Sequence, residues 1–303
     1  MSEQSSVATA GFGLARRPNA LQRIGKGALT FARKKPLGAI CAVVLIIFAL
    51  TAVFANQVDR YSPTVQQSGQ SLKSPSAEHW LGTDHLGRDI WSRIVHGARI
   101  SVTVGFAAVL IGKLGGVTLG LISGYRGGRL DLFIQRVVDA WLAFPSIVLL
   151  LAIVTMLGPS LFNVILAIGV GSMPGTTRLV RSTVLSAKEN DYVTAARALG
   201  AQEGRILFRH ILPNVMAPII VSASVTLGAA ILAESSLSFL GLGVPPPAPS
   251  WGGMLSREGR EYMIINPLLA VWPGLAITLV VMAFNLLGDA LRDVWDPRLR
   301  GSR

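Results

Sequence analysis

Residues 37–55 read LGAICAVVLIIFALTAVFA and contain no charged side chain. A helix of this length can cross about 30 Å of hydrocarbon, because each residue advances it by about 1.5 Å. The stretch follows a long basic leader, whereas a cleaved signal peptide starts sooner and has a shorter core. We therefore expect a retained transmembrane helix here.

The whole chain has the composition of a protein whose solvent is largely lipid. Of its 303 residues, 51% are hydrophobic and only 15% are charged, against about 25% charged residues in soluble domains. Its apolar runs are too long and too continuous for the strands of a membrane barrel. The sequence therefore predicts an all-α membrane protein with six transmembrane helices, at about 37–55, 100–124, 137–157, 161–180, 215–242 and 268–288.

The distribution of positive charge predicts how these helices are oriented. Most of the 28 Lys and Arg residues lie in segments that share one side of the membrane. Cytoplasmic loops carry such an excess, so we expect both termini and the polar segment 191–214 to be cytoplasmic. Arg88, Arg93 and Arg99 oppose the trend on the outer side. Neighbouring Asp84 and Asp89 can offset them.

These boundaries also predict the organisation of the chain. It comprises a basic cytoplasmic arm (1–36), a first transmembrane helix with an extracytoplasmic loop (37–99), a transmembrane core (100–290) and a cytoplasmic tail (291–303).

Several classes of function are excluded by the sequence. A nucleic-acid-binding protein gathers its Lys and Arg on one wet face, whereas here the net charge of +12 comes from clusters between apolar runs. No GxxxxGK(S/T) loop or HExxH motif occurs, and the four His residues are scattered. The single cysteine, Cys41, is expected to be a small buried hydrophobe. We therefore expect no catalytic, metal or cofactor site in this chain.

The polar segment DYVTAARALGAQEGRILFRHILPN, residues 191–214, lies between two apolar runs. Asp191 suits a helix N-cap, where its carboxylate would accept from backbone N–H groups. The alanine-rich residues that follow favour a helix, and Gly200 favours its left-handed stop. Pro213 is expected to close a second helix over 201–211. The segment therefore predicts a docking element for a cytoplasmic partner, with a solvated loop as the alternative.

This segment resembles the EAA motif of binding-protein-dependent ABC importer permeases. That motif reads Glu-Ala-Ala, three residues, Gly, nine residues, then Ile-x-Leu-Pro. The matching positions are Ala195, Ala196, Gly200, Leu212 and Pro213. Thr194 stands in place of the Glu, and His210 in place of the Ile.

Three more stretches resemble one branch of this family, the dipeptide, oligopeptide and nickel permeases, and within it the second (C-type) subunit. They are LGTDHLGRDIWSRIVHGARIS (81–101), SLSFLGLGVPPPAPSWGGML (236–255) and FNLLGDALRDVWDPRLR (284–300). The resemblance covers nearly the whole chain beyond about residue 30.

The resemblance implies a type I ABC importer permease in the bacterial cytoplasmic membrane. Its partners would be a homologous permease, two ATPase subunits that bind ATP and Mg, and an extracytoplasmic binding protein. Its substrate would be a di- or oligopeptide. Coupling helices at about 191–213 would lie on an ATPase, with the contact residues Tyr192, Ala195, Ala196, Arg197, Leu199, Gly200 and Pro213.

Polar residues inside the predicted helices are candidates for a translocation path. Glu234 should face a cavity, a substrate amine or a gate, or else form a helix–helix hydrogen bond. Asp139 and Arg136 are three residues apart, so they share a helix face and are expected to pair. Lys113 can either snorkel or meet the partner permease.

Small and kinking residues predict how the helices pack. Glycines at 112, 116 and 120 permit close packing between helices. Pro145 and Pro174 can kink two helices and free carbonyl groups toward a translocation path. In the loop 243–267, Trp251 suits an interfacial position. This loop is predicted to touch the binding protein or the pore mouth, with a passive outer cap as the alternative.

Three other functions stay open at this point. A nickel chelate, glutathione or an opine-like solute could replace the peptide in the same machinery. A secondary transporter often shows internal repeats with broken helices, and no clear repeat relates the two halves of this sequence. An intramembrane enzyme would need clustered acid and base residues or a metal site.

Overall fold

The computed structural model describes residues 29–295 of the chain. Contacts divide the chain into one unit that ends at Pro36 and a second that begins at Leu37. In the first unit, residues 29–34 are helical. The rest of the predicted basic arm, and the predicted tail from residue 296, lie outside the described residues.

From Pro36 onward the described regular structure is helical, apart from an isolated β-bridge between Thr83 and Asp89. The elements are α2 (Pro36–Val53), α3 (Ala55–Val58), α4 (Ile90–Arg126), α5 (Gly128–Leu142), α6 (Ser146–Leu157), α7 (Leu161–Lys188), α8 (Asp191–Ala198), α9 (Glu203–Arg205), the π-helix η1 (Ile206–Ile211), α10 (Leu212–Phe239), α11 (Trp251–Leu255), α12 (Arg257–Tyr262) and α13 (Leu268–Trp295).

Four of the described helices are long and apolar enough to cross a membrane. They are α2, α4, the continuous helix from Glu203 to Phe239, and α13. The pair α5 and α6 meets the same criterion only when taken together, across a bend of 90°. α7 has 28 residues but is not among these spans. The described residues therefore hold four such spans, or five with the bent pair, whereas the sequence predicted six.

The predicted span over 137–157 is divided in two, because α5 ends at Leu142 and α6 begins at Ser146, so the kink expected at Pro145 is a complete break of the helix. Pro145 precedes α6 in an extended conformation, with ψ of 126°. Proline has no N–H and disfavours helical geometry in the residue before it, so the helix breaks here. Pro174, in contrast, lies inside the unbroken helix α7.

The helix α4 packs closely on α7 over several turns. A Cβ atom added to Gly112 would lie 1.9 Å from Ser172 Oγ, and one added to Gly120 would lie 2.6 Å from Val180 Cβ. The predicted close packing of the glycines at 112, 116 and 120 is therefore confirmed. Successive contacts advance along both helices, so α4 and α7 run in the same direction. The bent pair α5–α6 carries the chain back between them.

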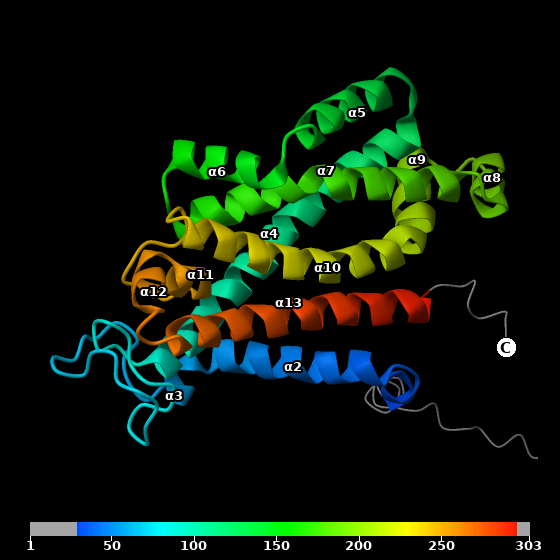
Figure 1. Ribbon diagram of the computed structural model, residues 1–303. Helices are drawn as coiled ribbons and strands as arrows, with labels where there is room; N and C mark the ends of the chain where they lie inside the picture. Colours follow the sequence, from blue (N-terminus) through cyan, green and yellow to red (C-terminus); the bar gives the residue numbers. More distant parts are fainter. Residues whose placement is uncertain (1–28, 296–303) are drawn as a thin grey trace, which may run out of the picture. The chain divides into compact units, whose positions relative to one another are not determined.

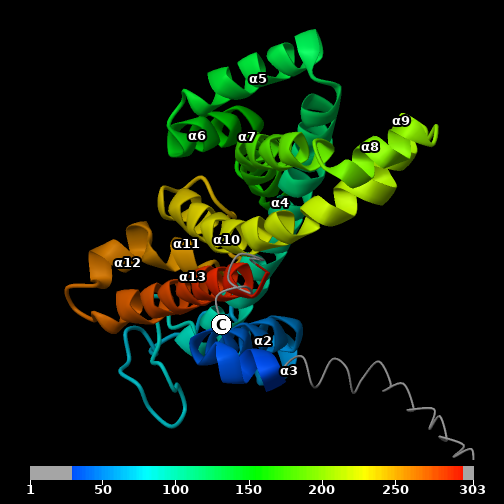
Figure 2. The ribbon, with the colours of Figure 1, turned by 90° about the vertical axis from the view of Figure 1, so that its right-hand side faces the viewer.

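The remaining long helices pack side by side. Figures 1 and 2 show α2 next to α13, and α10 between α13 and α7. Phe48 of α2, Phe284 of α13 and Trp251 of α11 belong to one buried cluster. Cys41 belongs to the same cluster, which confirms that it is a buried hydrophobe. In both views α5 lies on the side of the bundle away from α2.

Candidate functional site

The polar segment after α7 starts with a different cap from the one predicted. Asn190, and not Asp191, is the N-cap of α8. Its side-chain amide turns back and donates to the carbonyls of Ser186 and Ala187, at 3.2 and 3.0 Å. Asp191 is instead the first helical residue. A carboxylate in the first turn is favourable there, because the helix dipole is positive at this end.

The helix α8 ends as predicted at Gly200, whose φ is +75°. The N–H of Gly200 donates to Arg197 O at 2.9 Å, and the N–H of Ala201 donates to Ala196 O at 3.0 Å. These two bonds are those of a Schellman motif, which satisfies carbonyls that would otherwise have no partner at a helix end. The stop of α8 is therefore fixed by backbone geometry.

The second predicted helix does not end at Pro213. α9 and η1 pass without interruption into α10, so that Glu203–Phe239 form one helix of 37 residues. Pro213 occupies the first turn of α10, directly after the wider π-helical register of η1. Pro213 is therefore an interior residue of the continuous helix, and the local π-helical register before it accommodates the backbone groups that proline leaves without a partner. The predicted isolated second helix is therefore wrong.

Buried apolar side chains fix α8 and η1 against α7. Val193 and Ala196 of α8 pack in one cluster with Ile206 and Ile211 of η1 and with Val184 of α7. The four helix segments α7, α8, η1 and α10 thus share a core at this end of the bundle. The segment is a folded element rather than a solvated loop.

The opposite surface of this element is exposed. Of the predicted coupling residues, Ala196 is buried, and the exposed ones are Tyr192, Ala195, Arg197, Leu199, Gly200 and Pro213. Leu199 at the tip is 88% exposed, and Phe208 is 64% exposed. Large apolar side chains on a polar surface segment mark interaction sites. Two further exposed cations, Arg205 and Arg209, lie on the same element.

A cavity of about 520 Å³ adjoins α8 and involves residues that the sequence did not single out. It is lined by Tyr125 and Arg126 at the end of α4, by Arg197, and by Glu203. The Arg197 guanidinium lies 5.9 Å from the centre of the Tyr125 ring, within range of a cation–π contact. The end of α4 is therefore part of this element, a contact between segments about 70 residues apart that no local pattern indicates.

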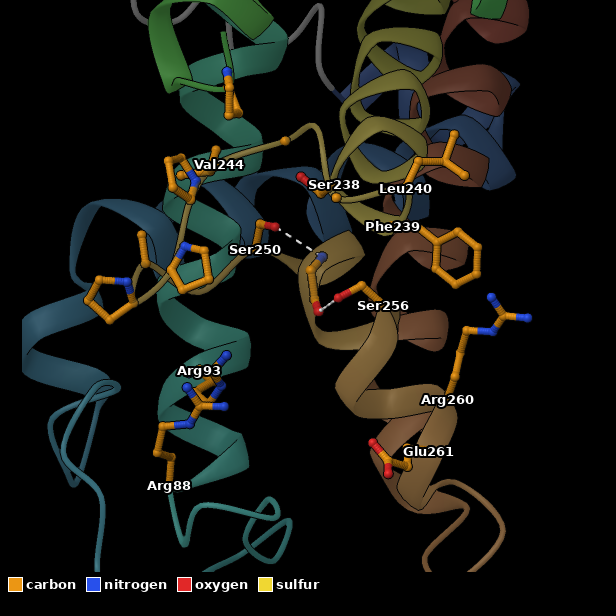
Figure 3. A pocket seen from close by; sticks show the side chains of 18 residues that line it. Arg88, Arg93, Ser238, Phe239, Leu240, Val244, Ser250, Ser256, Arg260 and Glu261 are labelled. Atoms are coloured by element: carbon orange, nitrogen blue, oxygen red, sulfur yellow. Dashed lines mark hydrogen bonds between the residues drawn. The ribbon is translucent and has the colours of Figure 1, made fainter. Parts of the chain in front are cut away.

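A larger cavity, of about 830 Å³, lies at the opposite end of α10 (Figure 3). Figure 3 shows Arg88, which precedes α4, and Arg93 of α4 at one side, and Arg260 and Glu261 of α12 at the other. The proline-rich stretch 244–248 also lines the cavity. The predicted loop is therefore the wall of a cavity that contains both basic and acidic side chains.

The loop that lines this cavity is held by specific contacts. Ser250 caps α11 by accepting from the N–H of Gly253 at 3.1 Å. Trp251 is 2% exposed, and its Nε1 donates to Ile94 O of α4 at 2.9 Å. The predicted interfacial position of Trp251 is wrong, because its indole fills the space between α11 and α4. Only a glycine at position 97 permits this contact, since a Cβ there would lie 2.5 Å from the indole ring.

The basic residues around the start of α4 are neutralised in part, as the sequence suggested. Arg88 Nε lies 2.6 Å from Asp84 Oδ2, and Arg93 Nε lies 3.6 Å from the same oxygen. Asp89 serves a different purpose. It caps α4 by accepting from Ser92 N and also lies 2.8 Å from His79 Nδ1.

The three residues predicted for a translocation path have separate environments. Glu234 is 0% exposed and accepts from Ser238 Oγ at 2.7 Å, a bond within α10 itself and not the helix–helix bond that was the predicted alternative. Asp139 pairs with Arg178 of α7 and not with Arg136, so the predicted i,i+3 pair is wrong. Pro174 lines a small apolar cavity of about 120 Å³ beside α5.

Lys113 also finds its contacts inside the chain. Its Nζ donates to Thr176 Oγ1 of α7 at 3.1 Å and to Ser222 Oγ of α10 at 2.7 Å. The ammonium group of Lys113 therefore makes its hydrogen bonds within this chain, and it neither extends to the membrane surface nor needs a partner subunit for its contacts. It joins three helices near the centre of the bundle.

Comparison with known proteins agrees with this architecture. The family model described as "Binding-protein-dependent transport system inner membrane component" matches residues 116–301. A dipeptide transport system permease protein of Alkalihalophilus pseudofirmus is 47% identical, with 88% of each chain covered. A glutathione transport system permease protein of Pectobacterium atrosepticum is 49% identical, with 75% of each chain covered.

A solved structure shares the fold at low sequence identity. The inward-facing MetNI methionine ABC transporter has a chain that is 21% identical, with a TM-score of 0.57. The match covers 68% of the present chain and 98% of that chain.

Proposed function

Because the chain belongs to the family of binding-protein-dependent transport system inner membrane components, we propose that it carries di- or oligopeptides across the bacterial cytoplasmic membrane. It acts as one permease subunit of an ATP-driven importer. A homologous permease completes the pore, an extracytoplasmic binding protein delivers the peptide, and two ATPase subunits bind ATP and Mg. The relatives named for dipeptide transport support the peptide substrate.

The exposed surface of α8 carries this proposal, as the place where an ATPase subunit docks. Leu199 projects from a helix end whose backbone is fixed by Gly200 and whose inner face is packed on α7. An apolar side chain that enters a groove, with Arg197 beside it, suits helix-in-groove recognition. The element is cytoplasmic in this proposal, in keeping with the excess of Lys and Arg on its side.

One continuous helix connects the proposed ATPase-docking surface of α8 with the 830 Å³ cavity at the far end of α10. The helix from Glu203 to Phe239 spans about 55 Å at 1.5 Å per residue. Its first turns pack against α8, and Phe239 and Ser238 at its far end line the 830 Å³ cavity. A displacement of α8 on the ATPase would therefore reach the outer cavity through one continuous helix.

We also propose six membrane crossings with both termini in the cytoplasm. The four apolar spans and the bent pair supply five of these crossings. The sixth is α7, which packs along α4 in the same direction and leads into the cytoplasmic element α8. The bent pair between them returns the chain, as this topology requires.

The test of this function is the variant Leu199→Glu in the assembled transporter. A charge at this exposed tip should leave membrane insertion intact, because Leu199 packs against nothing in the core. It should reduce co-purification of the ATPase and abolish ATP-driven peptide uptake. Thr194→Glu, which restores the usual first residue of the motif at an exposed site, is the matched control for added charge. Normal uptake by the Leu199→Glu variant would refute the docking assignment.

The secondary-transporter alternative and the choice of solute need separate measurements. Uptake that survives ATP depletion, with ion gradients held, would favour a secondary transporter. Competition of glutathione against labelled dipeptides would test the second substrate class, which a relative named for glutathione transport supports. Nickel chelates and opine-like compounds belong in the same competition series.

A further inference from the structure

The helix α5 presents its polar face to the bundle. Asp131 Oδ1 and Oδ2 each accept from Arg181 of α7 at 2.6 Å. Asp139 pairs with Arg178, one turn earlier in α7. Val138 between them is buried. Both acidic residues of α5 therefore form ion pairs on the side of the helix that faces α7.

The outer face of α5 combines apolar and basic side chains. Leu132, Phe133 and Val137 are 59%, 67% and 50% exposed. Arg129 and Arg136 are also exposed. They are seven residues apart, which puts them on one side of the helix at a distance of about 10 Å along its axis. Within residues 29–295 neither guanidinium has a hydrogen-bonding or ion-pair partner, since Asp139 is taken by Arg178.

The position of α5 exposes this face to the surroundings of the bundle. α5 follows directly on the end of α4, which in the proposed orientation is cytoplasmic, and it meets α6 at 90°. Figure 2 shows it at the edge of the bundle, beyond α7. As the first half of the bent pair that makes one crossing in the proposed topology, α5 begins at the cytoplasmic headgroup level, where a basic helix face with exposed apolar side chains is favourable.

We propose that this face binds anionic phospholipid of the cytoplasmic leaflet. Arg129 and Arg136 hold the phosphate groups, and Phe133 lies between them among the upper acyl chains. The planar guanidinium matches phosphate oxygens in pairs. Its long stem lets each group reach the headgroup level from an oblique helix. The inference rests on the proposed orientation of the chain, but not on its substrate.

A protein partner on the same face would have to meet different requirements. A homologous permease that covered α5 would bury two guanidinium groups, and burial is costly unless acids accompany them. Lipid phosphates provide the opposite charge and leave the guanidinium groups partly hydrated. The charge of the face therefore favours lipid over a second permease.

The experiment places a fluorophore on this face in the assembled transporter. Cys41 is the only cysteine of this chain, so Phe133→Cys in a Cys41→Ala background places a single bimane label on it, and the Cys41→Ala transporter without the new cysteine measures any label on the partner subunits. The transporter is reconstituted in nanodiscs with brominated phosphatidylglycerol or brominated phosphatidylcholine, and quenching gives the relative affinity of the two lipids. We expect phosphatidylglycerol to be preferred.

The variant Arg129→Gln/Arg136→Gln tests the two cations. One basic residue near an anionic surface strengthens binding about fivefold, so the double variant should lower the preference by up to about 25-fold. The control variant Arg205→Gln/Arg209→Gln removes the same amount of charge from the cytoplasmic element. It should leave the preference for phosphatidylglycerol unchanged.

Two results would overturn the inference. Equal quenching by both lipids would show a lipid-facing surface without headgroup recognition. Absence of quenching, together with crosslinking to the second permease through the thiol introduced by Phe133→Cys, would assign the face to that subunit. Peptide uptake and ATPase activity measured in the same nanodiscs separate these results from a failure of the proposed transport function.

Discussion

Replacing Gly116 by alanine should loosen the packing of α4 on α7. The added Cβ would lie 2.5 Å from Thr176 Cβ and 2.8 Å from the carbonyl oxygen of Met173. Carbon atoms in contact prefer about 3.5–4.0 Å, so the two helices must separate by about 1 Å. The backbone oxygen cannot rotate away, and such overpacking costs about 1–3 kcal/mol.

Two other glycines provide matched controls for this substitution. At Gly115 the new Cβ would meet only the flexible end of Met173, with Cε at 2.6 Å. At Gly175 nothing lies within 4 Å. All three sites are helical, so each alanine gains about 1 kcal/mol of helix propensity, and this gain cancels in the comparison.

The assay is thermal unfolding of the purified transporter, followed by fluorescence and by the loss of the monodisperse peak. Gly116→Ala should be less stable than Gly175→Ala by about 1–3 kcal/mol. This corresponds to a lowering of Tm by several degrees. Gly115→Ala should lie between the two. Equal stability of the variants at 116 and 175 would refute the argument that backbone contact between α4 and α7 requires glycine.

Three further substitutions test the other parts of the structure. Gly200→Ala forces a side chain into the left-handed region of backbone conformation at a cost of about 1 kcal/mol, so peptide uptake per ATP hydrolysed should fall. Gly204→Ala is the control, because an added Cβ there would have no atom within 4 Å, and its uptake per ATP should equal that of the wild type. Trp251→Ala should lower the free energy of unfolding by about 3–5 kcal/mol, because the indole is buried. Trp80→Ala should cost much less in the same thermal assay, because Trp80 is half exposed. Asp131→Asn removes the ion pair with Arg181 that joins α5 to α7, which should lower the free energy of unfolding by about 1–3 kcal/mol. An unchanged Tm in the same thermal assay would contradict this pairing.

Local sequence rules predicted the features that depend on a few neighbouring residues. The apolar run at 37–55 is long enough to be a span wherever it packs, and Gly200 stops α8 because only glycine adopts a φ of +75° without strain. The glycines at four-residue spacing on α4 follow the same logic, because a helix face without side chains invites close packing.

Features that depend on partners from other helices could not be predicted from the sequence. Pro145 breaks a helix and Pro213 does not, because the second sits at the start of α10 after a π-helical turn. Both prolines obey the same local chemistry. The surrounding backbone decides whether the helix breaks at the proline, as at Pro145, or continues through it, as at Pro213.

The sequence by itself determined that this chain lies in a membrane, where its polar segment falls and which family it resembles. The tertiary structure alone decided that Asp139 pairs with Arg178, that Lys113 joins three helices and that Trp251 is buried against α4. Hydrophobicity and backbone conformation are properties of single residues or short runs, so the sequence displays them directly. Ion pairs and cavity walls depend on which helices lie side by side, and that is set by the packing of the whole bundle.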